Sequence, residues 1–279
     1  MTRPRTISLI GPAGSGKSTL ALSWSARFPE YKKVDDLAPL LEYLRLDRAV
    51  VDATCPVELR KKLAAERSEY HYLADRVDEY LAALRAEPGL LPTARFCTPI
   101  GAQAMEVDDP MVWDDILVRL ARTLDPEGHY LIEYARGHDQ AYLRGFGLSE
   151  EQVYEHTLSG LLRALPPELR MRSAILHVGA DHGTRVARNE ARKLKTGQFT
   201  PTKVMEEVYR RDVFAQAHDS ENEDFRWGLE RIGDYLLPVV SIRNEKQRDE
   251  RELREFFDRA VVRAMELFEI YGGAPMTLA

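Results

Sequence analysis

Short apolar runs and stretches of helical spacing follow one another along the whole chain. Most of the runs are continuous rather than alternating in polarity, which is typical of parallel strands covered on both faces. Their order predicts a doubly wound α/β sheet within a single domain over residues 1–279. Five runs predict core strands: Thr6–Ile10, Lys32–Asp35, His129–Glu133, Arg172–Val178 and Pro238–Ile242. Ligands of such sheets bind beyond the carboxyl ends of the strands, so candidate site residues are those that follow these runs.

Two further stretches carry apolar residues at helical spacing over many turns. From Pro56 to Glu87, the apolar stripe faces either a core or a partner. This stretch is too long for a simple crossover, so we expect residues 55–106 to form a helical insert on the substrate side. It either covers the acceptor site or buttresses the sheet. The stripe from Leu253 to Phe268 predicts a terminal helix packed on the core.

A glycine-rich loop follows the first predicted strand. Residues 11–19, which we call the phosphate loop, fit the pattern G-x-x-x-x-G-K-[ST], with a strand before them and a predicted helix after them. Glycines let the backbone wrap a phosphate chain with its N–H groups pointing inward. Lys17 then reaches the β- and γ-phosphates, and the Ser18 hydroxyl ligates Mg²⁺. The loop that predicts this ATP site consists of Gly11, Pro12, Ala13, Gly14, Ser15, Gly16, Lys17, Ser18 and Thr19.

Carboxylates stand at the ends of two predicted strands. Asp35 and Asp36 follow the second strand, where a carboxylate can accept the proton of an attacking hydroxyl. The same pair is also a common helix N-cap. Glu133 ends the third strand, where it either holds Mg²⁺ through water or positions the acceptor, or else faces solvent.

A basic segment begins directly after the fourth predicted strand. Arg185, Arg188 and Arg192 are spaced by three and four residues, so they share one helix face. Such a row either neutralises charge on a transferred phosphoryl group or forms a solvated face. We expect residues 185–211 to form a mobile lid, with Gly197 as a hinge.

Composition narrows the setting of the chain. A net charge of −6 argues against a broad nucleic-acid surface. The two cysteines, Cys55 and Cys97, have no metal-ligand spacing and do not form a disulfide framework. The first strand begins too early to leave room for a signal peptide, and no apolar run approaches membrane-spanning length. The sequence therefore predicts a cytoplasmic protein without a membrane partner.

Taken together, these segments resemble the phosphate-loop nucleoside and nucleotide kinases, of the uridine-kinase-like and deoxynucleoside-kinase-like branches. The resemblance implies a five-stranded parallel sheet with strand order 2-3-1-4-5. The segment from Val34 to Leu37 is similar to the acid motif of uridine and nicotinamide riboside kinases. It implies that Asp35 is the base, with Asp36 beside it at the substrate. Asp108, in a segment similar to the Asp-His-Pro…Phe-Asp segment of uridine kinases, would bind a ribose hydroxyl.

The same resemblance covers the later motifs. Arg188 and Arg192 stand at the arginine positions of the family's lid. Glu133 and Arg136 are similar to the Glu-Arg that follows the third strand of deoxynucleoside kinases, which implies substrate contacts. Asn244 follows the last strand, where many phosphate-loop kinases contact adenine. The Pro-Tyr-Asp segment of uridine kinases and the Glu-Trp motif of deoxynucleoside kinases are absent, and the insert matches neither branch.

The sequence thus predicts an ATP- and Mg²⁺-dependent kinase that transfers a γ-phosphoryl group to a hydroxyl of a nucleoside-like or other small polar metabolite. Two alternatives stay open: a polynucleotide-end or modified-base kinase, and a nucleotide-hydrolysing switch module without a small-molecule acceptor. A homodimer is compatible with the sequence. The acceptor, the choice between ATP and GTP, and the oligomeric state are not determined by these motifs.

Overall fold

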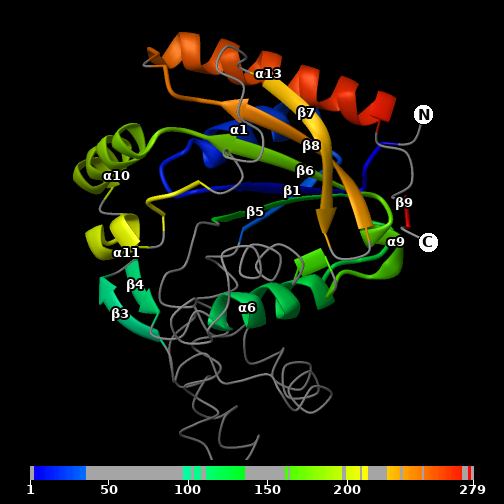
Figure 1. Ribbon diagram of the computed structural model, residues 1–279, viewed down its shortest axis with the longest axis horizontal. Helices are drawn as coiled ribbons and strands as arrows, with labels where there is room; N and C mark the ends of the chain where they lie inside the picture. The colour runs from blue at the N-terminus through cyan, green and yellow to red at the C-terminus, as the bar shows by residue number, and fades with distance from the viewer. Residues whose placement is uncertain are drawn as a thin grey trace, which may run out of the picture.

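A computed structural model gives the arrangement of the chain in space (Figure 1). The structure describes residues 3–35, 97–101, 104–107, 111–135, 161–162, 164–196, 199–207, 209–212, 225–232, 235–246, 248–271 and 276–277. Most of the expected insert, together with Asp36, Asp108 and Arg136, lies outside these residues. Where the insert is described at its C-terminal end, it is not helical: β3 (Cys97–Gly101) and β4 (Ala104–Val107) form an antiparallel pair.

The central sheet has the strand order β2-β5-β1-β6-β8-β7, with β9 on β8. The first five strands are mutually parallel, and they are the five that the sequence predicts, in the expected order 2-3-1-4-5. The expected strand count is wrong, because β7 and β9 add to β8 in antiparallel orientation. The strands are β1 (Thr6–Gly11), β2 (Lys32–Asp35), β5 (Tyr130–Ala135), β6 (Ser173–Gly179), β7 (Phe225–Ile232), β8 (Tyr235–Arg243) and β9 (Met276–Thr277).

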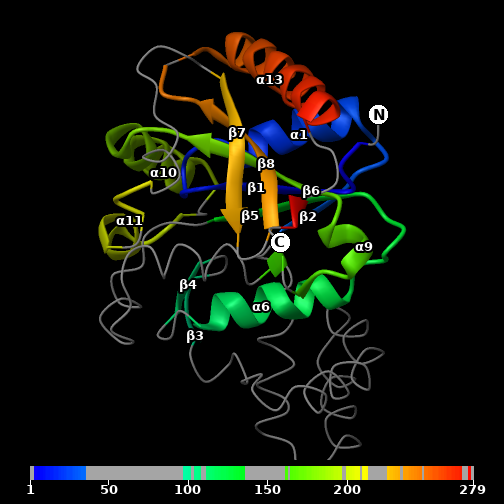
Figure 2. The same ribbon diagram turned by 45° about the vertical axis from the view of Figure 1, so that its right-hand side comes forward.

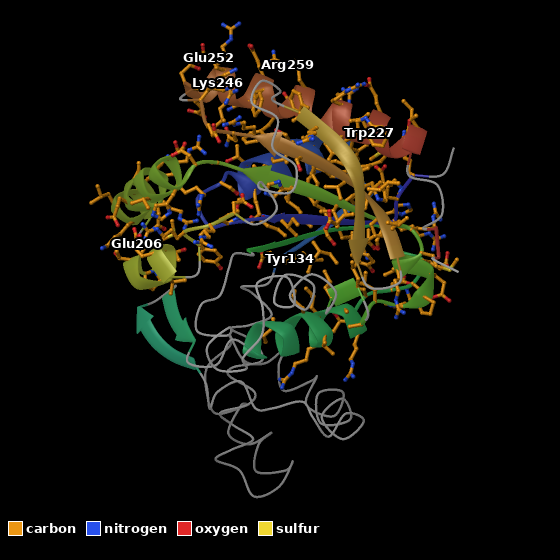
Figure 3. All side chains as sticks on the ribbon, viewed as in Figure 1. Tyr134, Glu206, Trp227, Lys246, Glu252 and Arg259 are labelled. Carbon is orange, nitrogen blue, oxygen red and sulfur yellow. The ribbon has the colours of Figure 1, made fainter. Side chains whose placement is uncertain are left out.

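Helices cover the sheet on both faces (Figures 1 and 2). Helices α1 (Lys17–Arg27) and α13 (Glu250–Tyr271) contact each other and lie on one face, and α6 (Met111–Arg122) lies on the other. The remaining described helices are α9 (Pro167–Arg170), α10 (His182–Thr196) and α11 (Thr202–Glu207). β7 is the last strand in the order given above, and the side chain of its Trp227 is 43% exposed (Figure 3).

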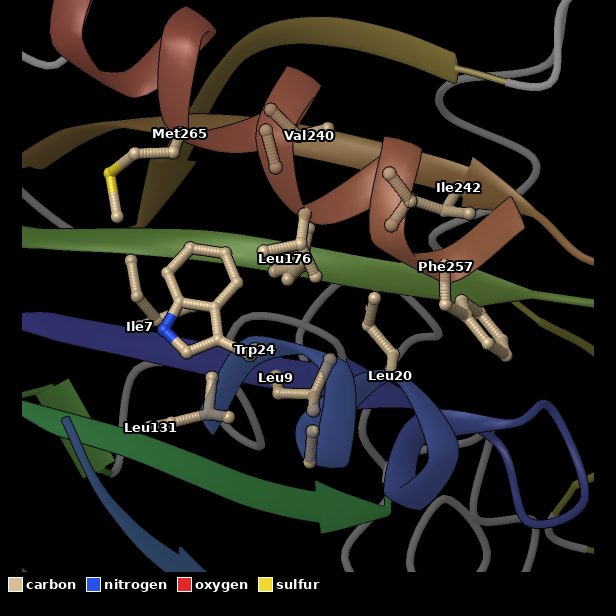
Figure 4. Packing of buried hydrophobic residues seen from close by; sticks show 14 of the residues in the cluster. Ile7, Leu9, Leu20, Trp24, Leu131, Leu176, Val240, Ile242, Phe257 and Met265 are labelled. Carbon is tan, nitrogen blue, oxygen red and sulfur yellow. The ribbon is translucent and has the colours of Figure 1, made fainter. Parts of the chain in front are cut away.

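Apolar side chains are buried in two layers, one on each face of the sheet. Alternate residues of β1 divide between them: Ile7 and Leu9 pack with α1 and α13, and Ile10 packs with the α6 layer. In the first layer, Trp24 is fully buried between the sheet and α13 (Figure 4). The expected terminal helix is confirmed, because α13 buries the predicted stripe against this layer through Phe256, Phe257, Ala260, Val261, Ala264, Met265 and Phe268.

Candidate active site

The phosphate loop joins β1 to α1 and packs closely against two other elements. Gly14 and Gly16 have φ angles of 80° and 106°, a region that favours glycine. A Cβ atom on Gly14 would lie 2.6 Å from the carbonyl oxygen of Arg185 in α10. A Cβ on Gly16 would lie 2.5 Å from Nδ2 of Asn244, which follows β8. A side chain at either position would therefore strain this loop conformation.

The Lys17 side chain lies against the first residues of the phosphate loop. Its side chain is buried, and its Nζ donates hydrogen bonds to the carbonyl oxygens of Gly11 at 2.8 Å and Pro12 at 3.0 Å. Gly16 is the N-cap of α1, so the ammonium group and the positive end of the helix lie at the same loop. Together they form a site that attracts an anion.

Ser18 and Glu133, the two predicted Mg²⁺ ligands, are in contact. The Ser18 hydroxyl donates to Glu133 Oε1 at 2.5 Å, and Lys33 Nζ lies 3.0 Å from Glu133 Oε2. Asp35 on β2 is the register partner of Glu133 on β5, so the predicted base lies on the neighbouring strand. Hydroxyl and carboxylate oxygens are ligands that Mg²⁺ accepts. The described part of the chain holds no group of three His, Cys, Asp or Glu residues suited to a metal, so Mg²⁺ here would also need phosphate and water oxygens.

Arg188 and Arg192 of α10 approach the same region. Arg188 Nη1 donates to the carbonyl oxygens of Asn244 at 3.0 Å and Ser15 at 3.4 Å, which places its guanidinium group at the phosphate loop. Burial lowers the pKa of Arg192, and the nearby Glu133 carboxylate opposes that shift. Burial likewise lowers the pKa of Arg188. Arginine stays charged in spite of such shifts, so both are partly desolvated cations that gain strongly from a bound phosphate.

Arg185 does not join them, contrary to the expected row of three. Its side chain is fully buried and donates to three carbonyl oxygens: Ala180 at 2.9 Å, Arg210 at 3.2 Å, and Tyr209. It connects the start of α10 to the segment after α11. The predicted spacing is correct, but this guanidinium group stabilises the fold and does not face the phosphate loop.

The expected lid segment is held to the rest of the chain at both ends. Beyond the Arg185 contacts, Asp212 pairs with the buried His177 of β6, with Oδ2 3.1 Å from Nε2. His182, which precedes the segment, has its Nε2 3.0 Å from Oε1 of Glu206 in α11; Figure 3 labels Glu206. Mobility of the segment stays a prediction.

Sequence reasoning missed two buried polar residues near the site. His177 lies within the apolar run of β6, and a histidine in a fully buried strand is the one local signal of a buried partner. Asn189 of α10 binds Thr200 twice, donating from Nδ2 and accepting at Oδ1, both at 2.8 Å. No spacing in the sequence indicates that pair.

No protein-family model and no curated protein matches the chain. Among solved structures, a sugar kinase from Janibacter sp. HTCC2649 is similar at 13% identity and a TM-score of 0.40, over 93% of each chain. A gluconokinase from Sinorhizobium meliloti 1021 is similar at 12% identity and a TM-score of 0.38, over 96% of this chain and 98% of its own. TT1252 from Thermus thermophilus is similar at 19% identity and a TM-score of 0.34, over 94% and 98%.

All three TM-scores are below 0.5, and the fold class follows from the strand order and the phosphate loop of the chain itself. The five parallel strands have the order that the resemblance to phosphate-loop kinases implies, and the phosphate loop lies between β1 and α1. This confirms the fold class expected from the sequence. No helix among the described residues is long and apolar enough to cross a membrane.

Proposed function

We propose that the protein is an ATP- and Mg²⁺-dependent kinase that phosphorylates a hydroxyl group of a small polar metabolite. The observation that carries the proposal is that four predicted site groups lie together at the carboxyl ends of the parallel strands. The Ser18–Glu133 contact joins the phosphate loop to β5, Asp35 lies on the next strand, and Arg188 reaches the loop from α10.

Each group has a role in transfer. The loop N–H groups and Lys17 bind the β- and γ-phosphates, after Nζ leaves the Gly11 and Pro12 carbonyl oxygens that it now contacts. Ser18, and Glu133 through water, would hold Mg²⁺, which would neutralise charge on the phosphate oxygens. Arg188 and Arg192 stabilise the charge on the phosphoryl group in transit.

The reaction is a displacement at the γ-phosphorus. The acceptor oxygen forms a bond to that phosphorus while the bond to the bridging oxygen breaks, and ADP leaves with the electron pair. The acceptor hydroxyl loses its proton to the carboxylate of Asp35, which acts as general base. The chemical class of the acceptor is indicated by the resemblance to nucleoside kinases alone. That resemblance favours a nucleoside-like compound bound at Asp35, Asp36 and Asp108.

Release of ADP with and without candidate acceptors tests this function. Purified protein is mixed with ATP and Mg²⁺, alone or with pools of nucleosides, sugars and sugar acids, or polynucleotide ends. We expect slow ADP release alone and a clear rise with one small-molecule pool. Fast release that no acceptor changes would favour a switch module, and a rise only with polynucleotide ends would favour the nucleic-acid alternative. Either result contradicts the proposal.

A further inference from the structure

Asn244 occupies a junction between four parts of the fold. It follows β8 and is 1% exposed. Its Nδ2 donates to the Ser15 carbonyl oxygen in the phosphate loop at 2.8 Å, and its backbone N–H donates to Gly179 of β6 at 2.8 Å. Its own carbonyl oxygen accepts from Arg188 of α10 at 3.0 Å. One buried residue thus links the phosphate loop, the sheet and α10.

The orientation of the Asn244 amide is determined by two partners with opposite requirements. The Ser15 carbonyl oxygen can only accept, so it requires the NH₂ group. On the other side, Arg248 Nη1 lies 3.4 Å from Oδ1, and a guanidinium group can only donate. Arg248 is itself held, with Cζ 3.8 Å from the centre of the Phe256 ring. A flipped amide would face both partners with the wrong atom.

The amide contact determines which way a loop N–H points. In a trans peptide the carbonyl oxygen and the following N–H lie on opposite sides of the chain, and no peptide bond of the described residues is cis. Because the Ser15 carbonyl oxygen points to Asn244, the N–H of Gly16 points away from Asn244. Inward N–H groups are what a phosphate-binding loop requires. Gly16 also packs so closely on Nδ2 that a side chain there would displace the amide.

We propose that Asn244 is a positioning residue of the phosphate loop, one that recognises the polyphosphate chain through the loop and does not contact the base. The proposal rests on the function proposed above and differs from the adenine contact that the resemblance implies. Arg188 shares the Ser15 carbonyl oxygen at 3.4 Å. When Arg188 moves onto a phosphate, Asn244 still holds that oxygen, so the loop keeps its shape while the lid arginine is in use.

Affinities for ATP and for inorganic tripolyphosphate distinguish the two roles, because tripolyphosphate has no base. Asn244→Ala removes the donor, and Asn244→Asp replaces it with an acceptor. For each variant, we expect the affinities for ATP and for tripolyphosphate to fall by the same factor, on the order of tenfold or more. For Asn244→Asp, affinity recovers as the pH falls, because a protonated carboxyl group can again donate to Ser15. If Asn244→Asp does not fold, Asn244→Ser, which keeps a hydroxyl donor, replaces it in the assay.

Ser173→Ala is the matched control. Ser173 is also buried and donates to a backbone carbonyl, Leu169, at 2.9 Å, but it lies at the opposite end of β6 from the loop. We expect this change to lower thermal stability without changing either affinity. A loss of ATP affinity alone in the Asn244 variants would assign the residue to the base and overturn the inference, as would unchanged affinities. Wild-type protein that binds neither ligand would contradict the proposed function as well.

Discussion

Substitution of Gly16 by alanine tests how tightly the phosphate loop is built. Gly16 has a φ of 106°, and its added Cβ would lie 2.5 Å from Asn244 Nδ2 and 3.2 Å from Phe257 Cζ. A left-handed backbone costs an L-residue about 1–2 kcal/mol. Displacing the Asn244 amide from Ser15 costs about 1–2 kcal/mol more, because a buried donor and acceptor lose each other. The native loop should therefore be disfavoured by about 2–4 kcal/mol.

This cost appears in one of two measurable quantities. If the native loop is retained, the free energy of unfolding falls; if the loop relaxes, stability is kept and ATP affinity falls. Urea unfolding without ligand gives the first quantity, and calorimetric titration with ATP and Mg²⁺ gives the second. We predict that the two losses sum to about 2–4 kcal/mol.

Gly183→Ala is the control for this substitution. Gly183 lies in α10, has no left-handed φ, and meets only Asp181 Oδ1, at 3.3 Å from an added Cβ. Alanine is favoured over glycine in a helix by about 1 kcal/mol, which offsets that contact, so stability should change by about 1 kcal/mol at most. If Gly16→Ala and Gly183→Ala behave alike in both assays, the reasoning about the loop is wrong.

Four further outcomes follow from the site. Lys17→Ala should leave the fold intact by circular dichroism but lower turnover about several hundredfold or more, because the positive charge that binds the phosphates is lost. Turnover near that of the wild type would refute the site. Asp35→Asn should lower kcat about 10²–10⁴-fold with little change in ATP affinity, whereas a large loss in Asp36→Asn alone would reverse their roles. Hydrogen exchange over residues 185–211 should slow when ATP and Mg²⁺ are added, since phosphate supplies the counter-charge for the lid arginines; unchanged exchange there, with protection of the phosphate loop, would contradict a lid. Asp181 caps α10, and hydrogen bonds from Thr184 lower the pKa of its carboxyl group, so the stabilisation is present above the unfolded carboxyl pKa and is lost as the pH falls. Asp181→Ala should therefore lower the free energy of unfolding by about 1 kcal/mol at neutral pH and match the wild type in acid. An equal difference at both pH values in urea unfolding would contradict this.

The sequence predicts β1 and β6 because each is a short apolar run buried on both faces, with every residue buried. The edge strand β2 is the exception, because its four residues are exposed or half-buried. The sequence does not predict β7, which alternates in polarity, carries Arg226 and Glu230, and is interrupted by Gly228. Such a strand forms because β8 offers it a partner in an antiparallel register, and that partner is not visible locally.

The site divides in the same way. The phosphate loop is predicted because its chemistry is contained in nine consecutive residues. Ser18 and Glu133 are predicted together because strand order brings the ends of β1 and β5 side by side. The burial of Arg185 was not predictable, because it depends on a carbonyl group of Tyr209, 24 residues away. The position of the Asn244 amide was not predictable either, because it depends on the carbonyl group of Ser15 in a loop distant in sequence.

Transfer of label from γ-labelled ATP into a pool of metabolites tests the central claim most directly. The wild-type protein and Lys17→Ala are incubated with the pool and Mg²⁺, and the products are separated and identified. We predict that the wild-type protein moves the label into one hydroxyl-bearing compound and that Lys17→Ala does not. Label found only in inorganic phosphate, or transfer that survives in Lys17→Ala, would contradict the account.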